Sequence, residues 1–149
     1  MERSLVLVKP DGVQRGLIGE IIQRFENRGL RLLGAKFMQV SPELAKAHYS
    51  VHEGKPFYDA LIKFITSAPV MALVWTGPEA ISAIRQTVGK TRGTEADPGT
   101  IRHDFALQAR YNLVHASDSV ENAEAEIALW FKPEEIVEWK RVTEDWMFE

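Results

Sequence analysis

A histidine at position 115 stands where a strand is expected to end and a helix to begin. It follows the apolar pair at 113–114 (Leu-Val) and precedes a small polar run at 116–118 (Ala-Ser-Asp). An imidazole is largely neutral near pH 7 and is a competent nucleophile toward phosphorus. The free N–H groups of a helix N-terminus favour phosphate. The pattern indicates phosphoryl chemistry at His115, although a histidine that only closes a strand by hydrogen bonding fits the same residues.

A carboxylate lies on the inward face of the last long helix expected from the sequence. Glu126 falls on the same stripe as Ala123, Ile127 and Trp130, at i+3 and i+4 spacing. A carboxylate that faces inward needs a donor, because burying it unpaired is costly. His115 is a candidate donor, and Glu126 would then orient one ring nitrogen and leave the other lone pair free. The alternative is a glutamate at the edge of the stripe that reaches solvent.

The strand that carries His115 raises a geometric question. Side chains alternate between the two faces of a regular strand, which puts Asn112 and His115 on opposite faces. Both can serve one pocket only if the backbone bends before His115.

Cationic and hydroxyl side chains gather at element ends or beside one long loop. Lys9 ends the first expected strand, Arg85 lies late in a helix, and Arg102 follows the loop at 89–100, which contains Thr91. Each cation alone is typical of a solvated surface charge. Together they lie where an α/β sandwich gathers a site, and long ordered loops are usually functional.

Aromatic residues offer weaker signals. Phe57 follows Pro56 at the start of a helix and either stacks on a nucleotide base or packs in the core. Tyr49 and the four tryptophans are interpreted by default as core or interface residues.

Composition and motif searches exclude several other classes. The chain has 149 residues, no cysteine and a net charge of −3, so a thiolate metal site, a Cys nucleophile and a large nucleic-acid-binding basic face are not expected. Its longest apolar run, at 70–75, is far too short to span a bilayer. The Gly-Lys-Thr at 89–91 is not a P-loop, because Ile84 stands where that fingerprint needs a glycine. We therefore expect a cytoplasmic protein that binds neither membrane nor nucleic acid.

Strands and helices alternate along the chain. Apolar runs predict strands at 5–8, 30–40, 70–75 and 112–116, and helical periodicity predicts helices near 17–28, 42–54, 57–65, 78–89 and 118–131. Residues 9–12 read as a turn, and Asp118 with Glu121 reads as a capping box. The pattern predicts a single α/β domain over residues 1–149, with helices covering one face of a four-stranded sheet.

Taken together, these residues resemble the nucleoside diphosphate kinase family. The resemblance rests on the Lys-Pro-Asp-Gly opening at 9–12 in register with the Asn-Leu-Val-His-Ala-Ser-Asp run at 112–118, and it covers nearly the whole chain. It implies a ferredoxin-like sandwich with a four-stranded antiparallel sheet. It also implies transfer of the terminal phosphate between nucleoside tri- and diphosphates.

The resemblance also implies roles for individual residues. His115 would be the nucleophile, and Glu126 and Ser117 would hold its imidazole. Lys9 and Asn112 would contact the sugar hydroxyls, with Lys9 also near the phosphates. The phosphate ligands would be Arg85, Thr91 and Arg102, while Tyr49 would lie against the histidine and Phe57 would stack on the base.

Cofactor and assembly follow from the same resemblance. Mg²⁺ would be held mainly by nucleotide phosphates and water, with Asp118 in the outer shell and no metal site formed by the protein alone. The long tail through Glu149 is similar to that of family members that form homo-oligomers, hexamers more often than tetramers.

Three positions depart from the family pattern. Arg-Gly-Thr at 92–94 stands where Asn-Pro is common, and losing a proline is expected to loosen the loop and affect subunit packing. His103 replaces a usual glycine beside Arg102, and Ala116 replaces a commoner glycine. No residue that the chemistry needs is lost.

Two other functions are compatible with the same fold class. A nucleotide sensor would bind ADP without forming a covalent intermediate. An RNA-binding module would need sheet aromatics and a basic face, whereas the expected strands here are mostly aliphatic and the chain is acidic.

Overall fold

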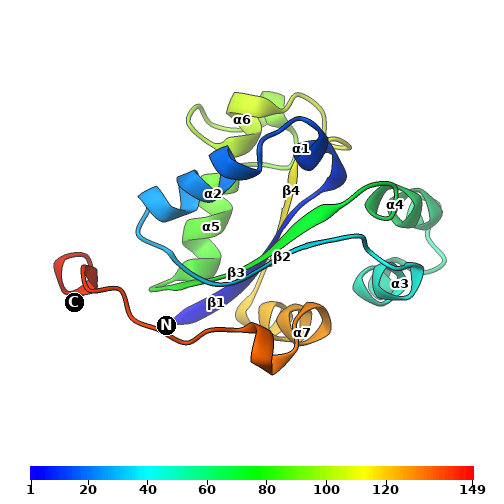
Figure 1. Cartoon of the computed structure of the whole chain (residues 1–149). Helices are drawn as coiled ribbons and strands as arrows, with labels where there is room; N and C mark the ends of the chain where they lie inside the picture. The colour runs from blue at the N-terminus through cyan, green and yellow to red at the C-terminus, as the bar shows by residue number, and fades with distance from the viewer.

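The computed structural model describes every residue from Met1 to Glu149, and its centre is a four-stranded antiparallel sheet. The strands are β1 (Glu2–Val8), β2 (Arg31–Met38), β3 (Val70–Gly77) and β4 (Val114–Ala116). Their order in the sheet is β2-β3-β1-β4, so β1 lies between β3 and the short strand that carries His115. The predicted ferredoxin-like architecture is confirmed (Figure 1).

Seven α-helices connect and cover the strands. They are α1 (Pro10–Gln14), α2 (Ile18–Asn27), α3 (Pro42–His48), α4 (Tyr58–Ile65), α5 (Ala80–Val88), α6 (Ile101–Phe105) and α7 (Val120–Trp130), with single 3-10 turns at η1 (Ser50–His52), η2 (Gly93–Glu95), η3 (Pro133–Glu135) and η4 (Glu144–Trp146). The Ser41-Pro42 start of α3 is confirmed, because the Ser41 hydroxyl accepts a hydrogen bond from the Leu44 N–H at 3.1 Å. No helix combines the length and the apolar character needed to cross a membrane.

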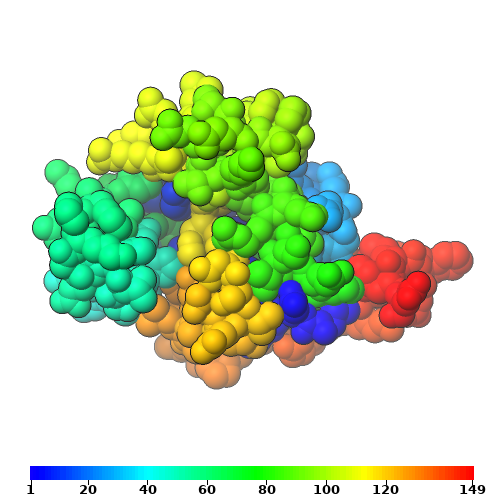
Figure 2. Space-filling view, turned by 180° about the vertical axis from the view of Figure 1, so that it is seen from behind, coloured from blue at the N-terminus to red at the C-terminus, as the bar shows by residue number.

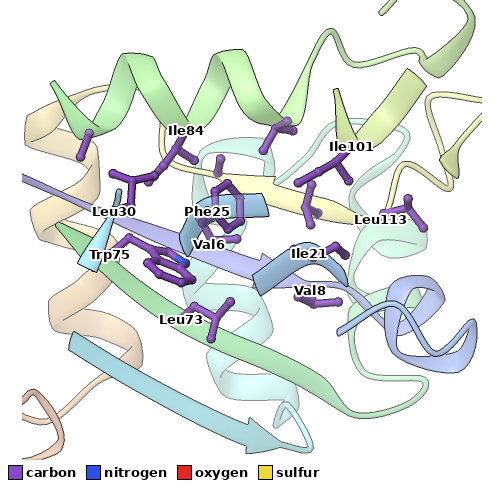
Figure 3. Close-up of a cluster of buried hydrophobic side chains, with 14 of the residues drawn as sticks. Val6, Val8, Ile21, Phe25, Leu30, Leu73, Trp75, Ile84, Ile101 and Leu113 are labelled. Carbon is purple, nitrogen blue, oxygen red and sulfur yellow. The ribbon is translucent and has the colours of Figure 1, made fainter. Parts of the chain in front are cut away.

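Helices cover both faces of the sheet, so the prediction of one covered face is wrong. Val6 and Val8 of β1 point into a cluster beneath α2 and α5, whereas Leu5 and Leu7 point into a second cluster against α7. Figure 3 shows the first cluster, with Ile84 and Phe25 packed over the sheet. All four β1 side chains are fully buried, which is why the run at 5–8 is continuously apolar rather than alternating.

Two local predictions also need correction. The expected turn at 9–12 is the start of helix α1, with Pro10 at its first position, where a missing N–H costs nothing. The cap of α7 is Ser119 rather than Asp118, because the Ser119 hydroxyl accepts the Asn122 N–H at 3.1 Å. Asp118 instead accepts a bond from the Asn122 side-chain amide at 2.7 Å.

The bend required before His115 is present as a γ-turn. Leu113 has φ +76°, and the Val114 N–H donates to the Asn112 carbonyl at 2.8 Å. A γ-turn with positive φ is rare and strained for a residue with a side chain. The turn shortens the predicted strand 112–116 to Val114–Ala116 and breaks the alternation that would separate Asn112 from His115.

The long loop at 89–100 contacts the end of α6 through residues 92–94, the Arg-Gly-Thr run that departs from the family pattern. The Thr94 N–H donates to the Leu107 carbonyl at 3.3 Å, and Gly93 lies buried against the end of α6. A Cβ at Gly93 would lie 2.0 Å from the Ala106 carbonyl oxygen, so only glycine fits there.

The tail after α7 runs beside strand β2. The Val137 N–H donates to the Leu33 carbonyl at 2.8 Å, and the Trp139 indole N–H donates to the Leu32 carbonyl at 2.7 Å. The end of the chain extends away from the sheet, as Figure 1 shows at its left side, with Val142 and Trp146 about nine-tenths exposed.

We predict that Gly93→Ala lowers the free energy of unfolding by about 1–3 kcal/mol or more, because the methyl group overlaps the Ala106 carbonyl. Gly19→Ala is the matched control: its Cβ meets nothing within 4 Å in α2, so helix propensity makes that variant more stable by about 0.8–1 kcal/mol. Denaturant unfolding measures both. Equal stability of the two variants would contradict the packing assigned to the loop.

Candidate active site

A cleft of about 500 Å³ opens between the α3–η1 segment and α7, with β4 at its base. Figure 2 shows this hollow between the cyan lobe and the yellow-orange segment, with blue atoms of the N-terminal region visible inside it. Its volume lies within the range of small-ligand pockets. Eight of the ten predicted site residues line it, namely Lys9, Tyr49, Arg85, Thr91, Arg102, Asn112, His115 and Glu126. Ser117 and Phe57 do not.

His115 is held by a carboxylate on the facing helix. Its Nε2 lies 2.9 Å from Glu126 Oε2, and the Ser117 hydroxyl donates to Glu126 Oε1 at 2.6 Å. Glu126 therefore faces inward as predicted. Ser117 is buried, and its hydroxyl acts on the imidazole through this bond to Glu126.

Hydrogen bonding fixes which nitrogen of His115 is free. Burial alone would raise the pKa of Glu126, but the hydrogen bonds from His115 and Ser117 outweigh it and hold that pKa below the usual value. An ionised carboxylate only accepts hydrogen bonds, so Nε2 of His115 must carry the proton. In the neutral ring the lone pair then lies on Nδ1, which makes no hydrogen bond to the protein.

Lys9 and Asn112 meet at the floor of the cleft. The Lys9 ammonium donates to Asn112 Oδ1, and the Asn112 amide donates to the Thr91 carbonyl at 2.9 Å. Burial lowers the pKa of Lys9 to about 8, with Arg102 adding to the effect and Asp11 opposing it. Lys9 is thus a half-buried cation whose pKa lies close to neutral pH, and Asn112 links it to the long loop.

Arg102 is locked in place by the backbone around it. Three of its N–H groups donate to the carbonyls of Asn112, Gly89 and Val114, at 3.2, 3.1 and 2.6 Å. A guanidinium has five N–H donors, so two remain for a ligand. Burial and the charge of Arg85 lower the pKa of Arg102 to about 10, so it stays cationic at neutral pH.

The ring that packs against His115 is His48 rather than the predicted Tyr49. The His48 and His115 ring centroids lie 4.8 Å apart at 84°, while Tyr49 packs against His48 at 4.7 Å. Tyr49 still lines the cleft, and burial raises its pKa to about 12. The sequence signal for His48 is its i,i+4 spacing with His52, which places two cleft histidines on one face of the predicted helix.

Phe57 lies outside the cleft lining, at the start of α4. Its side chain is about half exposed, and its ring packs on His52 at 5.2 Å. This position rules out the core interpretation and leaves a face available for a stacking partner.

Histidine and carboxylate groups also cluster at His48, His115 and Glu126, whose ligand atoms lie within 4.8 Å of one another. The Trp130 indole only donates hydrogen bonds, and it donates to His48 Nδ1 at 3.1 Å. Burial and the proximity of His115 lower the pKa of His48 to about 4, so this ring is neutral and carries its proton on Nε2. Both nitrogens of His48 are therefore occupied, and the cluster does not suit a metal ion.

The cleft lining offers one carboxylate besides Glu126 as a ligand for Mg²⁺. Asp118 lines the cleft, and its hydrogen bond from Asn122 outweighs partial burial and lowers its pKa. One ionised carboxylate near bound phosphates is a common protein contribution to a Mg²⁺ site.

His103 turns away from the cleft. Its Nδ1 lies 3.1 Å from Asp104 Oδ1, and it lines a separate hollow on the surface together with Arg15 and Tyr111. The extra bulk expected beside Arg102 therefore does not enter the site.

The fold thus places a histidine and three cationic side chains in one cleft. The nucleoside diphosphate kinase family model matches residues 2–136. A relative with that name from Synechococcus sp. (strain JA-3-3Ab) is 54% identical over 100% of both chains. Another from Symbiobacterium thermophilum is 59% identical over 99% of this chain and 98% of the relative. The chain belongs to the nucleoside diphosphate kinase family.

Solved structures show the same similarity. A family protein from Babesia bovis has a TM-score of 0.97 at 49% identity, covering 99% of this chain and 100% of that one. A halophilic nucleoside diphosphate kinase from Halobacterium salinarum in complex with CDP has a TM-score of 0.96 at 50% identity, covering 99% of both chains.

The lowered pKa of Lys9 predicts that activity depends on pH. It is cationic below its pKa of about 8 and loses its charge as the pH rises through that value. We expect kcat/KM for phosphate transfer to fall above pH 8, measured between pH 6 and 10. Lys9→Arg removes this decline, because a guanidinium stays charged. If kcat/KM of the wild-type protein stayed constant up to pH 9.5, phosphate transfer would not depend on the positive charge of Lys9, and the prediction would be contradicted.

Proposed function

We propose that this protein transfers the terminal phosphate of a nucleoside triphosphate to a nucleoside diphosphate through a phosphohistidine on His115. The observation that carries the proposal is the hydrogen bond from His115 Nε2 to Glu126, which leaves Nδ1 unpaired beside a cluster of cations. A nucleophile oriented by a third group is the expected arrangement for covalent catalysis.

The reaction has two half-steps. The Nδ1 lone pair attacks the terminal phosphorus, the bond from phosphorus to the bridging oxygen breaks, and the nucleoside diphosphate leaves with the electron pair. A terminal oxygen of a second nucleoside diphosphate then attacks the same phosphorus and the P–N bond breaks. The developing imidazolium is stabilised by the ionised Glu126.

Charge neutralisation is the main demand of phosphoryl transfer. Lys9, Arg85 and Arg102 supply three positive charges along the cleft, and Thr91 adds a hydroxyl. Mg²⁺ held by the nucleotide phosphates, water and Asp118 would supply the remaining positive charge. Together they balance a triphosphate.

We propose broad tolerance of base and sugar. Phe57 offers a half-exposed face for stacking, and stacking accepts any base. Lys9 and Asn112, already linked, would contact sugar hydroxyls. The complex of the halobacterial relative with CDP is consistent with a pyrimidine substrate.

Residues 1–149 are proposed to form one domain that assembles into a cytoplasmic homo-oligomer, a hexamer rather than a tetramer. The exposed tail side chains Val142 and Trp146 support assembly, because large exposed apolar groups favour contact with a partner. Nucleotide substrates support a cytoplasmic location.

Incubation with ATP labelled on its terminal phosphate tests the mechanism. We expect an acid-labile, base-stable label on the protein that is lost in His115→Ala. His103→Ala is the matched control and keeps the label, because its ring faces outside the cleft. Nucleotide binding without label would support a sensor instead, and label retained in His115→Ala would disprove the assignment.

Sedimentation tests the assembly. Six chains of 16.9 kDa each give a particle of about 101 kDa. We expect Trp146→Ala to weaken that assembly, because it removes an exposed apolar contact. A wild-type particle of monomer or tetramer mass would contradict the hexamer.

A further inference from the structure

The strained γ-turn before His115 is held by the segment at 9–11, where α1 begins. The Leu113 N–H donates to Asp11 Oδ2 at 3.0 Å, and the Leu113 carbonyl accepts the Lys9 N–H at 2.8 Å. Both polar backbone groups of Leu113 are therefore tied to the start of α1. A residue at φ +76° persists only when its surroundings over-determine it.

The other oxygen of Asp11 has no donor. Asp11 Oδ1 is buried and makes no hydrogen bond, and a buried acceptor without a partner is destabilising. Its negative charge is compensated by the cations nearby, since Asp11 raises the pKa of both Lys9 and Arg102 against the effect of burial. One oxygen of the Asp11 carboxylate is therefore left without a hydrogen bond, while the other accepts the Leu113 N–H.

The turn held by Asp11 determines where the cleft residues point. In a regular strand Asn112 and His115 would face opposite sides of the sheet, and the turn brings both into one cleft. The same turn presents the Asn112 and Val114 carbonyls to Arg102. A change in the Leu113 peptide would move a proposed nucleophile and two proposed ligands together.

We propose that Asp11 is a positioning residue for phosphoryl transfer, acting through its acceptor bond to the Leu113 N–H to aim His115, Asn112 and Arg102 into one cleft. This inference rests on the proposed function of His115. Asp11 itself does not line the cleft.

Three variants separate positioning from simple stabilisation. Asp11→Ala removes the acceptor, and Asp11→Asn keeps an acceptor oxygen but removes the charge. Glu135→Ala is the matched control, because Glu135 Oε1 also accepts a backbone N–H, that of Lys132 at 2.8 Å, in the segment after α7 and outside the lining of the cleft. Each is assayed as the full chain, below its measured unfolding temperature, for the single-turnover rate of phosphohistidine formation from ATP and for ADP affinity.

We expect Asp11→Ala to slow phosphohistidine formation by about a hundredfold, the effect of misplacing reacting groups by about 1 Å, and to weaken ADP binding. Asp11→Asn restores most of the rate, and Glu135→Ala keeps the wild-type rate.

Two outcomes would overturn the inference. One is an Asp11→Ala variant as fast as the Glu135→Ala control, and the other is an Asp11→Asn variant as slow as Asp11→Ala. A wild-type protein that forms no phosphohistidine would instead overturn the proposed function, so the two failures are distinguishable.

Discussion

The hydrogen bond between Glu126 and His115 joins α7 to the sheet at the point where the chemistry is proposed. It requires a strand that carries His115, a helix that packs its apolar stripe on the sheet, and a carboxylate on that stripe. The strand supplies only three residues of pairing to β1, so the orientation of the ring depends on the elements around it rather than on the strand itself. Glu126 is ionised and accepts a hydrogen bond from Ser117, so the bond that orients the His115 ring is a charge-assisted hydrogen bond.

The second constraint is the concentration of positive charge in a chain that is acidic overall. Lys9 and Arg102 are half-buried, and their desolvation lowers the pKa of each. Backbone carbonyls and Asn112 hold these cations in place before any ligand arrives. Preorganised cations of this kind need no rearrangement when charge develops in the transition state. The net charge of −3 reflects the rest of the surface and says little about the cleft.

Much of the site could be predicted because its signals are local. Glu126 falls on a helical stripe, and the conflict between strand alternation and a shared pocket correctly required a bend before His115.

The second covered face of the sheet was missed because strand periodicity shows that β1 is buried without showing what buries it. The contact of His48 with His115, and the use of Ser119 rather than Asp118 as the cap, depend on packing between distant segments or on one residue of register. The individual roles of the cleft residues came from resemblance to a family, because spacing alone leaves each cation interpretable as a surface charge.

The nitrogen of His115 that receives phosphorus in the proposed reaction can be identified directly from a spectrum. Glu126 occupies Nε2 of His115, so the proposed phosphohistidine carries its phosphoryl group on Nδ1. Phosphorylated protein with ¹⁵N-labelled histidine, studied by ¹⁵N and ³¹P NMR, is predicted to show phosphorus coupled to Nδ1 of His115 and a retained Nε2 proton. Phosphorus bonded to Nε2, or to a histidine other than His115, would contradict the account.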